Sequence, residues 1–179
     1  MTPSAELVPV TSADVEMLRA WEHGQLGPGW RNRGASASPA AFEEQLWAGV
    51  LSQSLIRHRA SGEHVGWVQV LAPDFVSGVA HLAVARPVTC RRHLTLARGV
   101  VAFVDLAFQT WPFRKLYLET AEFTLPQVER LVGGLLDVEY RRLEVIWFDG
   151  RLWDQVGLAL TRTAWERSDL ARRFRLPVA

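Results

Sequence analysis

The chain has 179 residues, of which 49% are hydrophobic and 22% are charged. This length and composition predict one globular domain that is large enough to bury a core. The formal net charge is only +1. Such a balance gives no reason to expect nucleic acid or an anionic membrane as the main partner.

Cysteine content and hydropathy indicate a cytoplasmic location. Cys90 is the single cysteine, so no internal disulfide can form, which fits a reducing compartment. The first ten residues lack the basic and apolar regions of a signal peptide. The most apolar run, residues 99–108, is short and contains Asp105, so we expect no membrane span.

The first third of the chain predicts a strand, two helices and a long loop. Residues 6–10 have strand character, and Thr11 to Asp14 supply N-cap candidates for a helix that ends near residue 22. The glycine-rich segment 23–37 is long for a loop in a compact domain, and such loops are often functional. Within it, Trp30 and Arg31 are candidates for facing a substrate, with an exposed rim as the alternative.

Ser38 and Pro39 predict the start of the second helix, as N-cap and first helical residue. Its buried stripe is expected to include Phe42, Leu46, Trp47, Val50 and Leu51. Three strands with tight turns should follow, at residues 54–59, 64–71 and 79–85.

The second half predicts an alternation of helices and strands. A helix runs from after Arg91 to about Trp111 and is followed by a strand at 114–120 and a helix at 124–136. Asp149-Gly150 is a strong hairpin signal between strands 138–148 and 152–161. The tail from Thr163 is polar and arginine-rich, and we expect it to cover an edge or to fray.

This order of elements predicts an α+β fold. We expect a mixed, mostly antiparallel sheet of about seven strands with helices on both faces. The strands at 79–85 and 114–120 are joined through a helix, so they should run parallel. The helix between them begins beside basic residues, and a strand that leads into a helix N-terminus is suited to bind an anion such as phosphate. These basic residues are Arg91, Arg92, His93 and Arg98.

Four stretches carry a family resemblance: LVPVTSADVEMLRAW, HLAVA, FVDLAFQTWPFRKLYLET and EYRRLEVIWFDGRLWDQVGLALTRTAWE. With their spacings they resemble the GNAT superfamily of acyl-CoA-dependent N-acetyltransferases, and most of all the branch of the ribosomal-protein alanine acetyltransferases. The resemblance implies that the two parallel strands splay apart and that acetyl-CoA or another acyl-CoA binds between them. Backbone groups of Leu82, Ala83 and Val84 would then contact pantetheine.

The resemblance also implies that the turn after Arg91 holds the pyrophosphate of the acyl-CoA. The residues concerned are Arg91, Arg92, His93, Leu94, Thr95 and Leu96. The family pattern R/Q-x-x-G-x-G/A is matched at Arg91, whereas Leu94 and Leu96 stand in place of small residues. A leucine needs space where glycine lets the backbone approach phosphate.

N-acyl transfer needs a group that takes a proton from the attacking amine. Glu119, at the end of its strand beside the expected splay, is the first candidate, and Glu122 is close to it in sequence. A carboxylate paired with an arginine is the alternative interpretation of both. His81 is the second candidate base, with a structural histidine as the alternative. The tyrosine acid of the family has Leu131 at its place, and Tyr140 is a weak substitute.

Two tryptophans and the cysteine are further candidates for the site. Trp30 and Trp147 are the two tryptophans that we expect to line an acceptor pocket, which would suit an acceptor with an apolar or planar part. Cys90 is a candidate nucleophile or, alternatively, a small apolar loop residue. The five histidines show no metal-ligand spacing, so we expect no metal.

The resemblance therefore implies an N-acyltransferase that moves an acetyl or other acyl group from acyl-CoA to an amine of a small molecule or peptide. Two alternatives stay open: a GNAT-fold protein that has lost acyl transfer and serves as a binding or accessory protein, and a repurposed biosynthetic enzyme. We expect one domain over residues 1–165, an arginine-rich tail at 166–179 and, as an open alternative to a monomer, a homodimer.

Overall fold

The structure, a computed structural model, describes residues 4–24, 38–87, 89–132 and 134–174. Within these residues, seven strands form one sheet in the order β1-β2-β3-β4-β5-β7-β6. Only β4 and β5 are parallel neighbours, so the predicted mixed and mostly antiparallel sheet is confirmed. The strands are β1 (Ala5–Pro9), β2 (Val50–His58), β3 (His64–Asp74), β4 (Val79–Ala85), β5 (Lys115–Ala121), β6 (Asp137–Phe148) and β7 (Arg151–Thr161).

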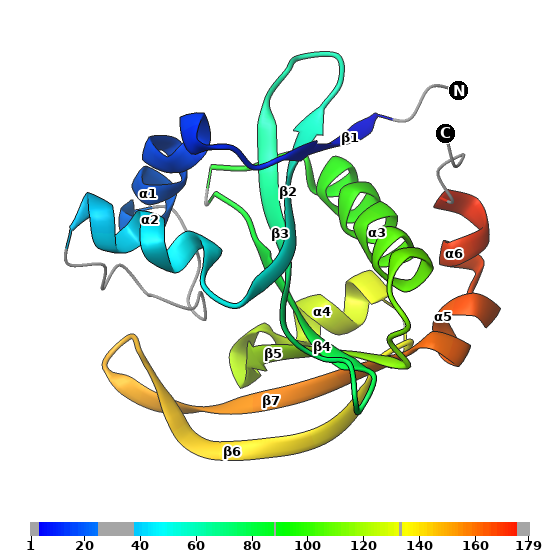
Figure 1. Ribbon diagram of the computed structural model, residues 1–179. Helices are drawn as coiled ribbons and strands as arrows, with labels where there is room; N and C mark the ends of the chain where they lie inside the picture. Colours follow the sequence, from blue (N-terminus) through cyan, green and yellow to red (C-terminus); the bar gives the residue numbers. More distant parts are fainter. Residues whose placement is uncertain (1–3, 25–37, 88, 133, 175–179) are drawn as a thin grey trace.

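Helices lie on both faces of the sheet (Figure 1). The helices are η1 (Ser12–Asp14), α1 (Val15–Gly24), α2 (Pro39–Trp47), α3 (His93–Thr110), η2 (Glu122–Thr124), α4 (Leu125–Val132), α5 (Arg162–Arg167) and α6 (Asp169–Phe174). We call the face covered by α1 and α2 the α1 face and the opposite one the α3 face. The start of α2 follows the predicted cap, since the Ser38 hydroxyl accepts a hydrogen bond from Ala41 N at 3.1 Å.

Each face has its own hydrophobic core. On the α3 face, Phe103 and Phe113 are almost fully buried against Leu116 of β5. On the α1 face, Leu18 and Phe42 pack with Trp67 of β3. In β2, Leu55 belongs to the core of the α1 face and the next residue, Ile56, to the core of the α3 face, as the alternation of side chains along a strand requires.

Two helix ends differ from the prediction. Val50 and Leu51 belong to β2 and not to the stripe of α2, because Ala48 is extended and Gly49 takes φ +67° directly before the strand. A left-handed residue at this point ends a helix, and glycine adopts it without strain. Helix α4 ends at Val132, before Leu136, and Gly134 with φ +74° follows it.

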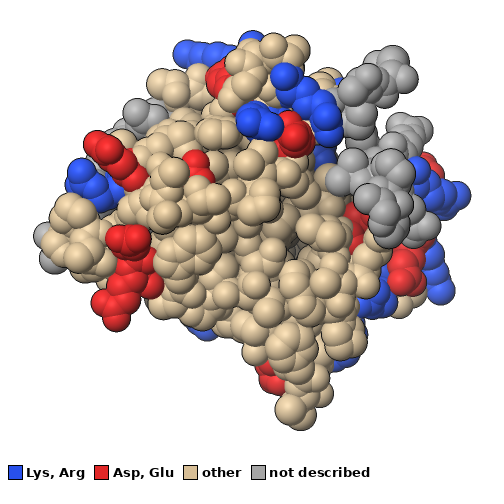
Figure 2. Space-filling view, turned by 45° about the horizontal axis from the view of Figure 1, so that its top comes forward, with Lys and Arg blue, Asp and Glu red and all other residues tan. Residues whose placement is uncertain are grey.

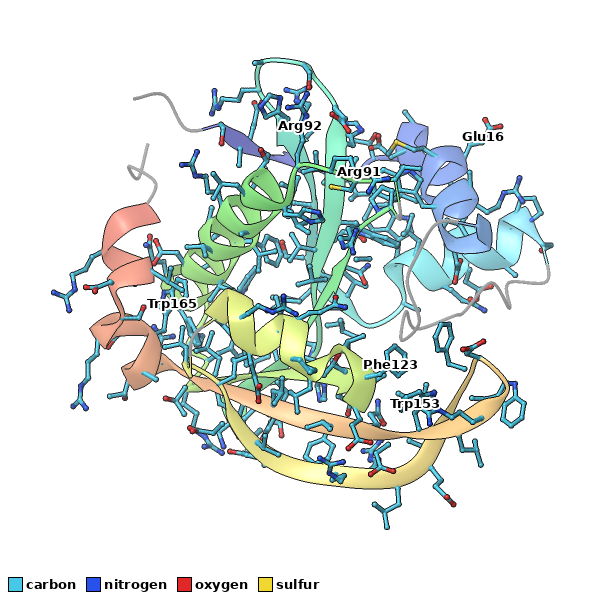
Figure 3. The ribbon with its side chains drawn as sticks, turned by 180° about the vertical axis from the view of Figure 1, so that it is seen from behind. Glu16, Arg91, Arg92, Phe123, Trp153 and Trp165 are labelled. Atoms are coloured by element: carbon cyan, nitrogen blue, oxygen red, sulfur yellow. The ribbon has the colours of Figure 1, made fainter. Side chains whose placement is uncertain are left out.

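The expected arginine-rich tail is folded as far as residue 174. Helices α5 and α6 occupy residues 162–174, and α6 lies beside α3. Trp165 is buried, and its Nε1 donates to the buried Asp105 carboxylate at 3.2 Å. Trp165 therefore fixes the segment to α3 (Figure 3). The division into a domain of residues 1–165 and a tail stays a prediction.

The sheet opens between β4 and β5. These strands pair only at Val79 with Lys115, Ala80 with Leu116 and His81 with Tyr117. Beyond this point β4 continues beside β3 and β5 continues beside β7. The two halves of the sheet consequently diverge like the arms of a V, as Figure 1 shows. The predicted splay of two parallel strands is confirmed.

Charged side chains are unevenly distributed over the visible surface. On the face in Figure 2, side chains of both signs lie mostly around the margin, and the middle is uncharged. No helix among the described residues is both long and apolar enough to cross a membrane.

Candidate functional site

The N-terminal end of α3 follows closely on the open end of β4. Helix α3 begins at His93, and its N-cap residue Arg92 makes no side-chain capping hydrogen bond. Leu96 N donates to Arg92 O at 3.1 Å as the first turn closes. The N–H groups of His93, Leu94 and Thr95 come before this first intrahelical hydrogen bond, so this end of the helix can receive an anion.

The two arginines at this end differ in their partners. Arg92 Nε lies 2.7 Å from Glu63 Oε2, so Arg92 is held by the turn between β2 and β3. Arg91 is exposed and forms no salt bridge with any other described residue. Figure 3 shows both at the start of α3. Of this pair, Arg91 is therefore the one with an uncommitted charge.

The two leucines of this turn lie in different environments. Leu94 is 62% exposed, and Leu96 is buried in the core of the α3 face. Leu96 fits there because Gly66 of β3 has no side chain: a Cβ at Gly66 would overlap with Leu96 Cδ1 and lie 3.1 Å from Ala85 O. Glycine in the strand thus accommodates a leucine where the family pattern has a small residue.

Gly66→Ala is expected to lower the free energy of unfolding by about 2 kcal/mol, because the added methyl group overlaps with a buried side chain. In a Leu96→Ala background the same substitution should cost much less. Chemical denaturation of the four proteins measures this coupling. An equal cost in both backgrounds would show that Leu96 does not occupy the space above Gly66.

The open edge of β4 carries the residues predicted to contact pantetheine. Leu82, Ala83 and Val84 pair with Val70, Gln69 and Val68 of β3. No described strand pairs with their other edge, since the contact with β5 ends at His81. An extended ligand can add to such an edge through backbone hydrogen bonds.

A hollow of about 410 Å³ lies where the two halves of the sheet diverge, and both predicted catalytic residues line it. Its lining residues are His81, Tyr117, Glu119, Tyr140, Arg141 and Arg142. The central strand β7 contributes only small side chains at two successive positions of this face, Gly157 and Ala159, which pair with Glu119 and Tyr117. The flanking strands β5 and β6 therefore form the walls.

Glu119 is held by neutral donors from two strands. The Tyr140 hydroxyl donates to Oε1, and Gln155 Nε2 donates to Oε2 at 2.8 Å. The Tyr140 ring covers Gly157, where a Cβ would overlap with it. Burial, followed by the hydrogen bond to Glu119, raises the pKa of Tyr140 to about 12. Tyr140 therefore stays protonated at neutral pH and acts as a donor.

His81 is supported by its neighbour on the parallel strand. Its ring lies 5.6 Å from that of Tyr117 between centroids. The Tyr117 hydroxyl donates to Glu139 Oε2 at 2.9 Å, and Lys115 also donates to Glu139. These bonds, that of Lys115 first, lower the pKa of Glu139. Glu139 thus carries a compensated charge and holds Tyr117 against His81.

The remaining candidates in the described part of the chain do not line this hollow. Glu122 is paired with Arg141 at 2.5 Å, as in the alternative interpretation of that carboxylate. Trp147 is 63% exposed on β6. Cys90 is buried, in agreement with an apolar loop residue. Trp30 and Arg31 lie outside the described residues. Among the described residues, no group of three or more His, Cys, Asp or Glu is placed to hold a metal ion.

An aromatic cluster was not predicted. Phe123 stacks on Phe148 with ring centroids 5.0 Å apart and meets Trp153 edge-on at 4.8 Å. Figure 3 shows Phe123 and Trp153 side by side near the turn between β6 and β7. Trp153 lies two residues before Gln155 on β7, so it extends the same face of the strand beyond the hollow. An apolar part of an acceptor could contact this cluster.

Comparison with known proteins gives structural matches only. No family model matches the chain, and no curated protein matches it in sequence. A chimera of the Vibrio cholerae spermidine N-acetyltransferase SpeG and hSSAT superposes with a TM-score of 0.75 and 12% identity, covering 92% of this chain and 99% of that one.

Two further SpeG structures from Vibrio cholerae agree. One, in complex with manganese ions, has a TM-score of 0.75 and 12% identity over 93% of this chain and 98% of that chain. The other, dodecameric and in an intermediate state, has a TM-score of 0.73 and 12% identity over 92% and 97%. At such low sequence identity, the superpositions establish the fold alone. Membership in the branch of the ribosomal-protein alanine acetyltransferases stays a prediction. The chain has the GNAT fold of these N-acetyltransferases.

Proposed function

We propose that the protein is an N-acyltransferase that moves an acetyl or other acyl group from acyl-CoA to the amine of a small molecule or peptide. The observation that supports this most is the short pairing of β4 with β5. It leaves an unpaired strand edge that leads to an uncapped helix N-terminus. The similar solved structures are N-acetyltransferases with the same fold.

The residues of the opening suit an acyl-CoA donor. The free edge at Leu82, Ala83 and Val84 offers backbone groups to the pantetheine amides. The start of α3, with Arg91 and the exposed His93 beside it, offers N–H groups and positive charge to the pyrophosphate. The donor supplies a thioester, whose carbonyl carbon is open to attack by an amine.

Glu119 is the proposed base. In the transfer, the amine nitrogen forms a bond to the acyl carbon while the carbon–sulfur bond breaks, and the amine gives up a proton to Glu119. Water protonates the leaving thiolate. Tyr140 and Gln155 keep the carboxylate in place through their hydrogen bonds, while each oxygen retains a lone pair for the amine. His81 is the second candidate base.

Acceptor and assembly are parts of the same proposal. The SpeG proteins act on spermidine by their names, so an amine acceptor is the coarse expectation for this chain. Trp147, Trp30 and Arg31 are proposed to contribute to its binding. One SpeG structure is dodecameric, and a homodimer or larger homo-oligomer is proposed here.

Release of free thiol from acetyl-CoA in the presence of an amine panel tests the proposed function. We expect thiol release that depends on both the acyl-CoA and an amine. Binding of acetyl-CoA without release for any amine would favour the alternative of a GNAT-fold binding protein. If acetyl-CoA does not bind and no thiol is released, the proposal is refuted.

Arg91→Ala is expected to raise the Kd for acetyl-CoA about tenfold. The substitution removes the guanidinium that is proposed to contact the pyrophosphate. Isothermal titration calorimetry measures the change. Arg59→Ala is the matched control, since Arg59 is also exposed and lies at the turn after β2. An unchanged Kd for Arg91→Ala would place the phosphate site elsewhere.

A further inference from the structure

The charges around the hollow are unequally satisfied. Three of its neighbouring carboxylates contact basic partners: Glu139 contacts Lys115, and Glu122 and Asp154 share the single guanidinium of Arg141. Glu119 accepts from two neutral donors. Among the described residues, the lining of the hollow itself holds one carboxylate, that of Glu119, beside the guanidinium groups of Arg141 and Arg142, so it does not favour a polycation.

Of the basic side chains at the hollow, Arg142 has longer polar contacts than Lys115 and Arg141. Its nearest contacts are Gln155 Oε1 at 3.5 Å and Glu119 Oε1 at 4.0 Å, and its side chain is 59% exposed. A guanidinium has five N–H donors, and distances of this length satisfy few of them. The Tyr140 ring lies 5.3 Å from the guanidinium carbon and supports it at the wall of the hollow.

Glu119 and Arg142 are close enough to bind two groups of one molecule. Glu119 Oε1 and Arg142 Nη2 are 4.0 Å apart, and both residues line the hollow. The amine and carboxylate of an α-amino acid are attached to the same carbon, so a ligand of this class presents an opposite charge to each residue. Arginine is suited to carboxylates because its planar fork can bind both oxygens.

We propose that the acceptor is a free α-amino acid, with its amine at Glu119 and its carboxylate on Arg142. The inference rests on the proposed acyl transfer and narrows its substrate. It differs from a polyamine acceptor, whose additional ammonium groups would be repelled by Arg141 and Arg142 in the lining. The aromatic cluster of Phe123, Phe148 and Trp153 favours an amino acid with an apolar side chain.

The test compares acceptors that have the carboxylate with acceptors that lack it. Thiol release from acetyl-CoA is measured with each apolar amino acid, with its amide and with spermidine. We expect kcat/KM for the best amino acid to exceed that for its amide at least tenfold and to exceed that for spermidine. Equal use of acid and amide, or a preference for spermidine, would overturn the amino acid proposal while leaving acyl transfer intact.

Arg142→Gln supplies the second readout. We expect it to raise KM for the amino acid at least tenfold with little change in kcat, and to bring acid and amide close together. Arg130→Gln, an exposed position on α4, is the control and should keep the wild-type ratio. An unchanged ratio in Arg142→Gln would overturn the role of Arg142. If the wild-type protein does not bind acetyl-CoA, the proposed function and this inference are refuted together.

Discussion

Glu119→Gln is expected to lower kcat for acyl transfer about 100-fold. A glutamine keeps the shape of the side chain and can still contact Tyr140, but it cannot take a proton from the amine. The Kd for acetyl-CoA should stay within about twofold, because the donor is proposed to contact β4 and the start of α3. Single-turnover kinetics with acetyl-CoA, together with calorimetry, measure both quantities.

Glu166→Gln is the matched control for this variant. Glu166 lies on α5, more than half exposed, 3.9 Å from Arg162, and its substitution should leave kcat unchanged. A wild-type rate in Glu119→Gln would remove Glu119 from the mechanism. In that case His81→Gln becomes the decisive variant, because His81 is the other candidate base in the hollow.

Arg162→Met is expected to lower the free energy of unfolding by about 3 kcal/mol. Its guanidinium donates to three backbone carbonyls at and after the end of α3: Phe108 O at 2.6 Å, Trp111 O at 2.7 Å and Phe113 O at 2.8 Å. Hydrogen bonds from a charged donor are worth more than neutral ones, and the carbonyls would lose their partner. Thermal and urea denaturation measure the loss.

Arg172→Met removes an arginine from an exposed position and serves as the control. Arg172 donates to one carbonyl, Arg167 O, and is 70% exposed at the side chain, so a change within about 0.5 kcal/mol is expected. A comparable loss in both variants would mean that the three carbonyls are not the cause. The bonds of Arg162 join the end of α3 to the segment before β5, and so they help to set the crossover that makes β4 and β5 parallel.

Local sequence signals predicted most of the fold. The bounds of β4 agree with the prediction, and the Ser38 cap and the Asp149-Gly150 turn lie where capping and turn preferences place them. The error at Val50 and Leu51 arose because apolar residues at helical spacing also suit a buried strand. Only the left-handed conformation of Gly49 separates the two elements.

The sequence predicted only part of the candidate hollow, because the positions of its residues depend on strand register. Glu119 and His81 lie in one hollow, as their positions beside the splay suggested. If the register at the hairpin turn continued unchanged along β6 and β7, Tyr140 would pair with Ala159. It pairs with Gly157 instead. This displacement brings Tyr140 to Glu119, and no local pattern predicts it.

The irregularity lies in β6 between Arg142 and Ile146. Glu144 has φ +53° there, and its N–H donates to Asp154 at 3.0 Å. The same carboxylate binds Arg141, so contacts between distant residues fix the bulge. A glycine at 157 opposite a tyrosine was the one available signal, and it becomes informative only after the register is known.

The most direct test of the central claim is the unfolding free energy of the protein with increasing acetyl-CoA. If acetyl-CoA binds in the opening between β4 and β5, saturation at 100 times its Kd should stabilise the native state by about 2.7 kcal/mol. The stabilisation should fall in Arg91→Ala at the same ligand concentration. An unfolding free energy that does not change up to millimolar acetyl-CoA would contradict the account.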